Sequence, residues 1–193
     1  MIYPGVDTDY FTPGGQKSDY YFTSSRLVPY KKIALIVEAF KLMPDKKLVV
    51  IGIGPQYKYV QRHAGANVSV LGFQNNEVLL EHMRSAKAFI FAAEEDFGIT
   101  PLEAQACGTP VLAYGRGGAS ETVIDGVTGL HFWAQSVEAI CDVVNRFETC
   151  ETQFDPRAIR NHAQRFSIAR FRSEFSIKIK KLWQAHRESS NEL

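Results

Sequence analysis

AFIFAAEEDFGITPLEAQACGTPVLA, residues 88–113, is the stretch that decides the fold class. It opens on Ala88–Ala92, an apolar run without polar alternation, as is typical of a strand covered on both faces. A polar loop follows, and Pro101–Cys107 is then predicted to be a helix that ends at Gly108. Val111–Ala113 is apolar again and predicts the next strand. A buried strand, a short loop, a helix and another strand form the unit from which parallel sheets are built.

The same alternation continues on both sides of this unit. Further strands are predicted at Tyr20–Ser24, Lys47–Ile51, Val68–Leu71 and Gly129–Phe132, and further helices at Ile33–Leu42, Gln56–Ala64 and Glu77–Arg84. The sequence therefore predicts an α/β fold with a Rossmann-like doubly wound parallel sheet.

Both ends of the chain depart from this alternation. Residues 1–19 are polar and rich in turn-forming proline and glycine. Near the other end, helices are predicted over residues 136–149 and 155–188 without a strand between them. Asp155 is a suitable N-cap ahead of Pro156 at the first helical position. Residues 155–188 are therefore expected to form a C-terminal helical extension.

Composition and charge exclude several classes of protein. The 193 residues are 45% hydrophobic and 22% charged, which fits one globular domain over 1–193 and does not fit a disordered chain. With 22 basic and 21 acidic residues the net charge is +1, so no overall field favours nucleic acid as a partner. Three cysteines without metal-ligand spacing indicate a reducing compartment. No apolar run reaches the length of a membrane-spanning helix.

Glycines and basic side chains follow the predicted strands at their carboxyl ends, where open parallel sheets bind ligands. Arg26 and Lys31 come after the first strand, and glycine-containing turns follow the second, third and fifth. Glycine admits close backbone approach, helix N-termini present free N–H groups, and basic side chains compensate negative charge. This edge of the sheet is therefore predicted to bind a phosphate-bearing ligand.

Some of these features also have an explanation that requires no ligand. Arg26 and Lys31 could be solvated surface charges. Thr100-Pro101-Leu102-Glu103 has the spacing of a capping box, in which Glu103 would only hold the start of a helix. Gly52-Ile53-Gly54 lacks the third glycine of the dinucleotide fingerprint, so it is a weak indication of a nicotinamide cofactor.

Taken together, the segments resemble one family. Glu95 to Glu103, with Phe97-Gly98 between them, resembles the E-x7-E signature of retaining glycosyltransferases of family 4. The sequence SRLVPYKK at residues 25–32 resembles that family's diphosphate motif G-R-L-x-x-x-K-G, although Ser25 and Lys32 stand where the family has glycine. The Glu-Asp-Phe-Gly form is similar to bacterial or archaeal polysaccharide mannosyltransferases. Further matches in spacing are Gly52-Ile53-Gly54-Pro55, Leu71-Gly72 and Gly117–Glu121.

The resemblance implies a donor-binding role. Family 4 enzymes have two Rossmann-like domains in the GT-B arrangement, and this chain resembles the C-terminal one, which binds the nucleotide-sugar donor. The N-terminal acceptor domain is not in the sequence, so we interpret the chain as a fragment that transfers no sugar by itself. The full-length protein would transfer a hexose, with mannose as one candidate, from a GDP- or UDP-linked donor to a polysaccharide or lipid-linked glycan. It would be cytoplasmic and could lie against the inner face of the membrane.

The resemblance also assigns roles to individual residues. Arg26 and Lys31 would bind the donor diphosphate and stabilise it as the leaving group. Glu95 would bind the transferred sugar and Glu103 the ribose hydroxyls. The remaining donor-binding residues would contribute backbone groups and the walls of the site: Gly52, Gly54, Gly72, Phe73, Phe97, Gly98, Ile99 and Thr100.

No metal and no other cofactor are expected, because two fixed cations can do what a divalent metal does elsewhere. Asp7-Thr8-Asp9 matches the Asp-x-Asp metal pattern of some nucleotide-sugar enzymes, but it lies in a turn-rich leader rather than after a buried strand. Two other classes stay open. One is a nucleotide-sugar epimerase with the same GT-B architecture, and the other is a non-catalytic nucleotide-binding module.

The predicted C-terminal helix carries an apolar stripe along one face. In the resembled family this helix packs partly on the first domain. Its outer part, near Leu182 and Trp183, is therefore expected to fray or to mediate self-association. The stripe consists of Ile168, Phe171, Phe175, Ile179 and Leu182.

Overall fold

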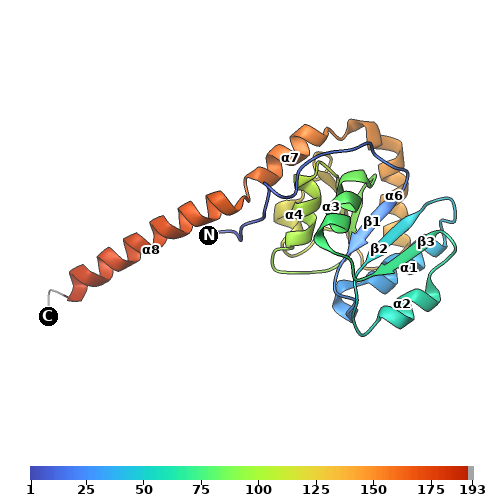
Figure 1. Cartoon of the computed structure of the whole chain (residues 1–193), viewed down its shortest axis with the longest axis horizontal. Coiled ribbons are helices and arrows are strands. Elements are labelled where there is room, and N and C mark those ends of the chain that lie inside the picture. The colour runs from blue at the N-terminus through green and yellow to red at the C-terminus, as the bar shows by residue number, and fades with distance from the viewer. Residues whose placement is uncertain (191–193) are drawn as a thin grey trace.

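A computed structural model describes residues 1–190, which fold around one six-stranded parallel sheet (Figure 1). The strands lie in the order β3-β2-β1-β4-β5-β6. All six predicted strands are present, each within one residue of its predicted bounds. These bounds are β1 Tyr21–Ser24, β2 Leu48–Ile51, β3 Val68–Gly72, β4 Phe89–Phe91, β5 Val111–Tyr114 and β6 Gly129–Phe132.

Helices cover both faces of this sheet, and successive strand residues point into two different cores. Ile90 contacts the core formed with α1 and α6, whereas Phe89 contacts the core formed with α3 and α4. Three short elements were not predicted (η1, α5 and η2), because three or four residues show no hydrophobic period. The helices are α1 Ile33–Lys41, α2 Tyr57–His63, α3 Asn76–Ser85, α4 Ile99–Ala106, α5 Ala119–Thr122, α6 Val137–Cys150, α7 Pro156–Gln164 and α8 Ile168–Ser190, with 3-10 turns η1 Pro29–Lys31 and η2 Glu151–Gln153.

The strand order has its switch point between β1 and β4. The chain leaves β1 through α1 and continues to β2 on one side, and it leaves β4 through α4 and continues to β5 on the other. Because α1 and α4 pack on opposite faces of the sheet, the loops that follow β1 and β4 diverge. Ligands of doubly wound sheets bind in the crevice that such loops leave.

The C-terminal extension is two helices, so the prediction of one helix over 155–188 is wrong at residues 165–167. The N-terminal segment causes the break. The Val6 N–H donates to the Phe166 carbonyl at 2.8 Å, and the Ile168 N–H donates to the Val6 carbonyl at 3.0 Å. These bonds replace the hydrogen bonds that the same groups would form in a continuous helix. The predicted N-cap is confirmed, because the Asp155 carboxylate accepts from the Arg157 N–H at 2.9 Å.

The two helices differ in their surroundings. α7 packs against α4 and belongs to the domain. α8 projects away from it (Figure 1), and from Arg172 to Arg187 every side chain is exposed. Phe175, Leu182 and Trp183 are 50%, 54% and 62% exposed, so the outer part of the apolar stripe has no cover within residues 1–190.

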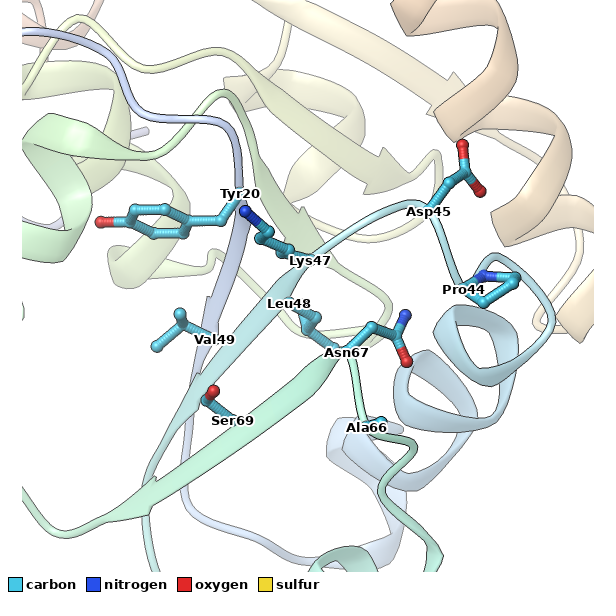
Figure 2. A pocket seen from close by; sticks show the side chains of 9 residues that line it. All are labelled: Tyr20, Pro44, Asp45, Lys47, Leu48, Val49, Ala66, Asn67 and Ser69. Atoms are coloured by element: carbon cyan, nitrogen blue, oxygen red, sulfur yellow. The ribbon is translucent and has the colours of Figure 1, made fainter.

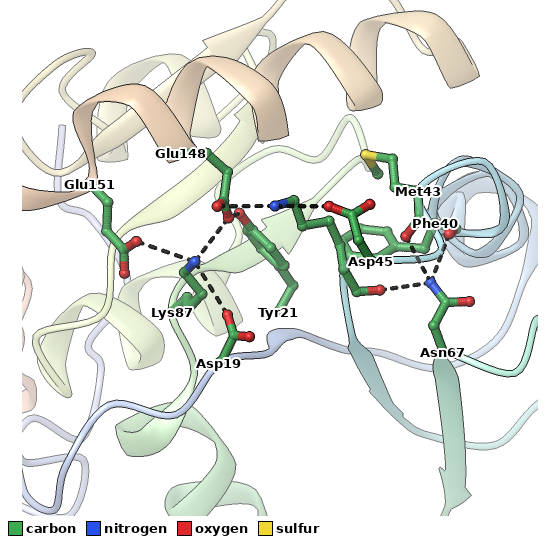
Figure 3. Close-up of polar contacts among 10 residues, drawn as sticks. Asp19, Tyr21, Phe40, Met43, Asp45, Asn67, Lys87, Glu148 and Glu151 are labelled. Carbon is green, nitrogen blue, oxygen red and sulfur yellow. Dashed lines mark hydrogen bonds and ion pairs between the residues drawn. The ribbon is translucent and has the colours of Figure 1, made fainter.

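An ion-pair network closes the amino edge of the sheet (Figure 3). Glu148 of α6 accepts from Lys87 Nζ at 2.9 Å, from Lys46 Nζ at 3.1 Å and from the Tyr21 hydroxyl. Burial alone would raise the pKa of Glu148, but these three donors lower it to about 2. Lys87 also pairs with Asp19 and Glu151, so the network ties α6 to the starts of β1 and β4.

Asn67, directly before β3, forms a second group of hydrogen bonds at the amino edge of the sheet (Figure 3). Its Nδ2 donates to the carbonyls of Phe40, Met43 and Lys46, at 2.8, 3.0 and 2.6 Å. The last carbonyls of a helix have no partner within the helix. One side chain therefore satisfies the C-terminal end of α1 and the turn that leads to β2.

Candidate functional site

Two adjoining pockets lie at the carboxyl edge of the sheet, at the switch point. The first, of about 570 Å³, lies between the loops after β1 and β2 and the start of α4, and the second, of about 600 Å³, lies between η1 and the loop after β4. Thr100 lines both. Of the predicted site residues, the first pocket contains Arg26, Gly52, Gly54, Phe73, Thr100 and Glu103, and the second contains Lys31, Glu95, Phe97, Gly98, Ile99 and Thr100.

Only Gly72 of the predicted set lines neither pocket. It ends β3, and its carbonyl accepts from the Gly52 N–H at 2.8 Å. Sequence reasoning missed Tyr30, Glu94 and Asp96, which line the second pocket. Their position beside Lys31 and Glu95 in the chain was the only indication of this role.

The loop that carries Arg26 is fixed by the neighbouring loop after β2. The Ser25 N–H donates to the Ile51 carbonyl at 3.1 Å, and the Leu27 N–H donates to the Ile53 carbonyl at 2.9 Å. The Arg26 side chain is exposed and forms no ion pair or hydrogen bond with any other residue in 1–190. The loop therefore presents a free guanidinium to the first pocket.

Contact between these two loops explains the glycines after β2. A Cβ on Gly52, whose φ is +141°, would overlap the Ser25 carbonyl oxygen. A Cβ on Gly54 would lie 2.5 Å from the Leu27 carbonyl oxygen. Both positions therefore require glycine for the fold itself, whether or not a ligand approaches them.

Lys31 and Glu95 form an ion pair across the second pocket. Lys31 is the last residue of η1, and Lys32 follows in the left-handed region with φ +58°. The sequence has lysine here where the resembled family has glycine, and the backbone still adopts the conformation that glycine favours. The Lys31 ammonium also lies 5.3 Å from the centre of the Tyr30 ring.

The loop after β4 rests on the paired glycines after β5. The Gly118 N–H donates to the Glu95 carbonyl at 2.7 Å. A Cβ on Gly118 would overlap the backbone of Phe97, so only glycine permits this approach. This packing holds the backbone at Glu95 in place.

The capping-box interpretation of residues 100–103 is wrong. α4 begins at Ile99, two residues earlier than a Thr100 cap would allow, and its N-cap is Gly98 with φ +84° and no capping side chain. The first N–H groups of a helix have no partner within it, and Pro101 has no N–H. The N–H groups of Ile99 and Thr100 are therefore left at the wall of the two pockets.

Glu103 has no capping role and lies half-buried in the lining of the first pocket. Burial, with a smaller contribution from the charge of Asp7, raises the pKa of its carboxyl to about 7. No hydrogen bond from another residue in 1–190 reaches this carboxyl group. Its oxygens are therefore available to hydroxyl groups of a ligand.

Other features of residues 1–190 are less suited to binding a phosphate-bearing ligand. A pocket of about 450 Å³ lies at the amino ends of β1, β2 and β3 (Figure 2), at the edge opposite the switch point.

Asp7, from the Asp-x-Asp pattern, accepts a hydrogen bond from the Tyr10 N–H at 2.9 Å. Within the described residues, no three acidic, histidine or cysteine side chains gather as a metal site would require. None of the helices described there has the length and apolar character needed to cross a membrane.

Comparisons with known proteins agree on one family. The profile described as "Glycosyl transferases group 1" matches residues 12–166. A D-inositol 3-phosphate glycosyltransferase of Mycobacteroides abscessus is 30% identical over 86% of this chain and 43% of its own length. A GDP-mannose-dependent alpha-(1-6)-phosphatidylinositol monomannoside mannosyltransferase of Mycolicibacterium smegmatis is 35% identical over 73% of this chain and 44% of its own length. The chain therefore spans less than half the length of these relatives.

Solved structures show the same fold. Sucrose-phosphate synthase of Thermosynechococcus elongatus superposes with a TM-score of 0.84 at 24% identity, over 95% of this chain and 52% of that one. HepE of Anabaena, in complex with UDP-glucose, superposes with a TM-score of 0.79 at 22% identity, over 93% of this chain and 57% of that one. At these identities the likeness concerns the fold.

Proposed function

The chain belongs to the group 1 glycosyl transferases, and from this premise we propose that it is the donor-binding domain of a retaining hexosyltransferase. One observation carries the proposal. At the switch point, two basic and four acidic side chains line adjoining pockets on either side of the start of α4, and Glu95 and Glu103 are among the acidic ones. A nucleoside-diphosphate sugar carries two phosphates between two groups rich in hydroxyls, and this arrangement matches it.

The proposal assigns each charged residue to a part of the donor. Arg26 and Lys31 bind the diphosphate, Glu103 accepts hydrogen bonds from the ribose, and Glu95 accepts them from the transferred sugar. When the bond between the anomeric carbon and the phosphate oxygen breaks, negative charge grows on the departing phosphate. Fixed cations then stabilise the transition state more than the bound donor, which is the condition for catalysis.

The names of similar proteins support the choice of donor. One relative is GDP-mannose-dependent, and one structure of the same fold contains UDP-glucose. We propose a GDP- or UDP-linked hexose, with mannose as the first candidate, and a polysaccharide or lipid-linked glycan as acceptor. We expect the chain alone to transfer no sugar, because only one wall of the cleft is present to exclude water. Sugar transfer by this chain to an added acceptor would contradict that expectation.

Calorimetric titration of the chain with GDP, UDP and ADP tests the proposal. We expect weak binding of one of them, and Arg26→Ala should weaken it by about tenfold, because a charge-assisted hydrogen bond is lost. Arg62→Ala is the matched control, since Arg62 is an exposed arginine on α2 outside both pockets. Absence of binding by all three nucleotides, or equal effects of the two substitutions, would contradict the proposed site.

A further inference from the structure

Lys31 and Glu95 satisfy each other before any ligand arrives. Their side chains are 19% and 21% exposed, so the ion pair is largely shielded from water. The proposed function assigns these residues to different parts of the donor, the diphosphate and the sugar. The ion pair between the two side chains therefore competes with both assignments.

The backbone on both sides holds the pair in position. Lys31 ends η1 and is followed by a left-handed residue, while the Glu95 carbonyl accepts from the Gly118 N–H. The two side chains can therefore exchange partners while their loops stay in place. Arg26, by contrast, is free of acidic partners within residues 1–190 and meets a phosphate without competition.

The charge around the second pocket favours the exchange. Its lining contains one basic residue, Lys31, and three acidic ones, Glu94, Glu95 and Asp96. A phosphate that enters beside Lys31 competes with the Glu95 carboxylate for the ammonium group, and the two anions repel each other in a site that is partly shielded from water.

We propose, on the basis of the proposed function, that Glu95 competes with the diphosphate for Lys31 and thereby selects the nucleotide-sugar over the nucleoside diphosphate. When the donor binds, the Lys31 ammonium pairs with the phosphate instead of Glu95. The released Glu95 carboxylate then accepts hydrogen bonds from hydroxyls of the sugar. When the nucleoside diphosphate binds alone, the carboxylate is released with no hydroxyl to accept from. Glu95 is thus a specificity-determining residue that weakens product binding relative to donor binding.

Removal of the negative charge makes the proposal testable. Glu95→Gln should bind nucleoside diphosphate about fivefold more tightly than the wild type, as expected for the loss of a partly shielded ion pair. The same substitution should not tighten binding of the nucleotide-sugar, because a charged acceptor for its hydroxyls is lost as well. The preference for donor over product should therefore fall.

The experiment is calorimetric titration of the whole chain with UDP, UDP-glucose, GDP and GDP-mannose. Glu94→Gln is the matched control, because it removes one charge from the same pocket lining without a contact to Lys31. Lys31→Met, alone and together with Glu95→Gln, completes a double-mutant cycle. In the Lys31→Met background, Glu95→Gln should change nucleoside-diphosphate affinity no more than Glu94→Gln does. Thermal melting of each variant establishes that it is folded.

The outcomes separate this inference from the proposed function. Tighter nucleoside-diphosphate binding that appears only with Glu95→Gln and depends on Lys31 supports the exchange. If the wild type binds nucleotides but Glu95→Gln binds them equally or more weakly, the exchange is wrong and the donor site stands. If neither the wild type nor any folded variant binds any of the four nucleotides, the proposed donor site is wrong, and the exchange is wrong as well because it depends on that site.

Discussion

Glu103→Gln should stabilise the domain and impair nucleotide binding at the same time. Glu103 is half-buried in the lining of the first pocket, and the pKa of its carboxyl rises from 4.5 to about 7, through desolvation first and the charge of Asp7 second. The unfolded chain ionises Glu103 near pH 4.5, whereas the folded chain keeps it protonated until about pH 7. Between these values the folded state binds the additional proton, so stability falls as the pH rises.

The magnitude follows from the difference between the two pKa values. The pKa rises from 4.5 to about 7, and each pH unit between these values costs roughly 1.4 kcal/mol. The free energy of unfolding is therefore lower by about 3 kcal/mol above pH 7. Glutamine cannot ionise and has nearly the same shape. The variant should therefore equal the wild type near pH 4.5 and exceed its free energy of unfolding by about 3 kcal/mol at pH 8.

Urea denaturation of both proteins at pH 5, 6, 7 and 8 measures this difference. At pH 8 the midpoint should rise by about 1.5 M, given a slope near 2 kcal/mol per molar urea. His82 and His162, whose pKa values are lowered mainly by burial, titrate in both proteins and cancel in the difference. Nucleotide affinity should rise with pH in the wild type, as the carboxylate forms, and stay low and flat in the variant. A stability difference that does not change with pH would refute the reasoning.

Three further predictions concern other parts of the fold. Lys32→Gly should stabilise the chain by about 1 kcal/mol in urea denaturation, because Lys32 is left-handed, whereas Lys32→Ala should not. Asn67→Asp should destabilise it by about 3 kcal/mol at pH 7, because a carboxylate would face three carbonyls; an unchanged urea midpoint would contradict this. Removal of residues 176–193 should abolish concentration-dependent association in sedimentation experiments, since the outer stripe of α8 is exposed. A wild-type chain that is monomeric at every concentration, with α8 as protected from hydrogen exchange as β1, would contradict this.

The sequence was sufficient to predict the strands and the edge of the sheet at which the two candidate pockets lie. Apolar runs and the glycines behind them are local, and each strand lies within one residue of its prediction. The order of the strands was not predicted, because hydrophobic period does not encode which strands are neighbours. The break between α7 and α8 was missed for a similar reason, since it depends on Val6, which lies at the opposite end of the sequence.

The structure brings all of the predicted site residues except Gly72 to two adjoining pockets, but the arrangement of their side chains was not predictable from the sequence. Residues 100–103 satisfy the local rule for a capping box, but the helix starts earlier, after Gly98, and Glu103 is left half-buried without a capping role. Opposite charge was the only indication in the sequence that Lys31 and Glu95 would pair with each other. Side-chain pairing of this kind depends on how two loops approach, and here the glycines after β2 and β5 determine that approach.

The two edges of the sheet differ in how their charges are satisfied. At the amino edge, Glu148 receives three donors and its pKa falls to about 2, so its ionisation favours the folded state. At the carboxyl edge, the ionisation of Glu103 opposes folding, and Arg26 has no acidic partner among the described residues. A diphosphate and ribose hydroxyls would supply what these two side chains lack. Lys31 and Glu95 already pair with each other, so a ligand that binds either side chain competes with this ion pair.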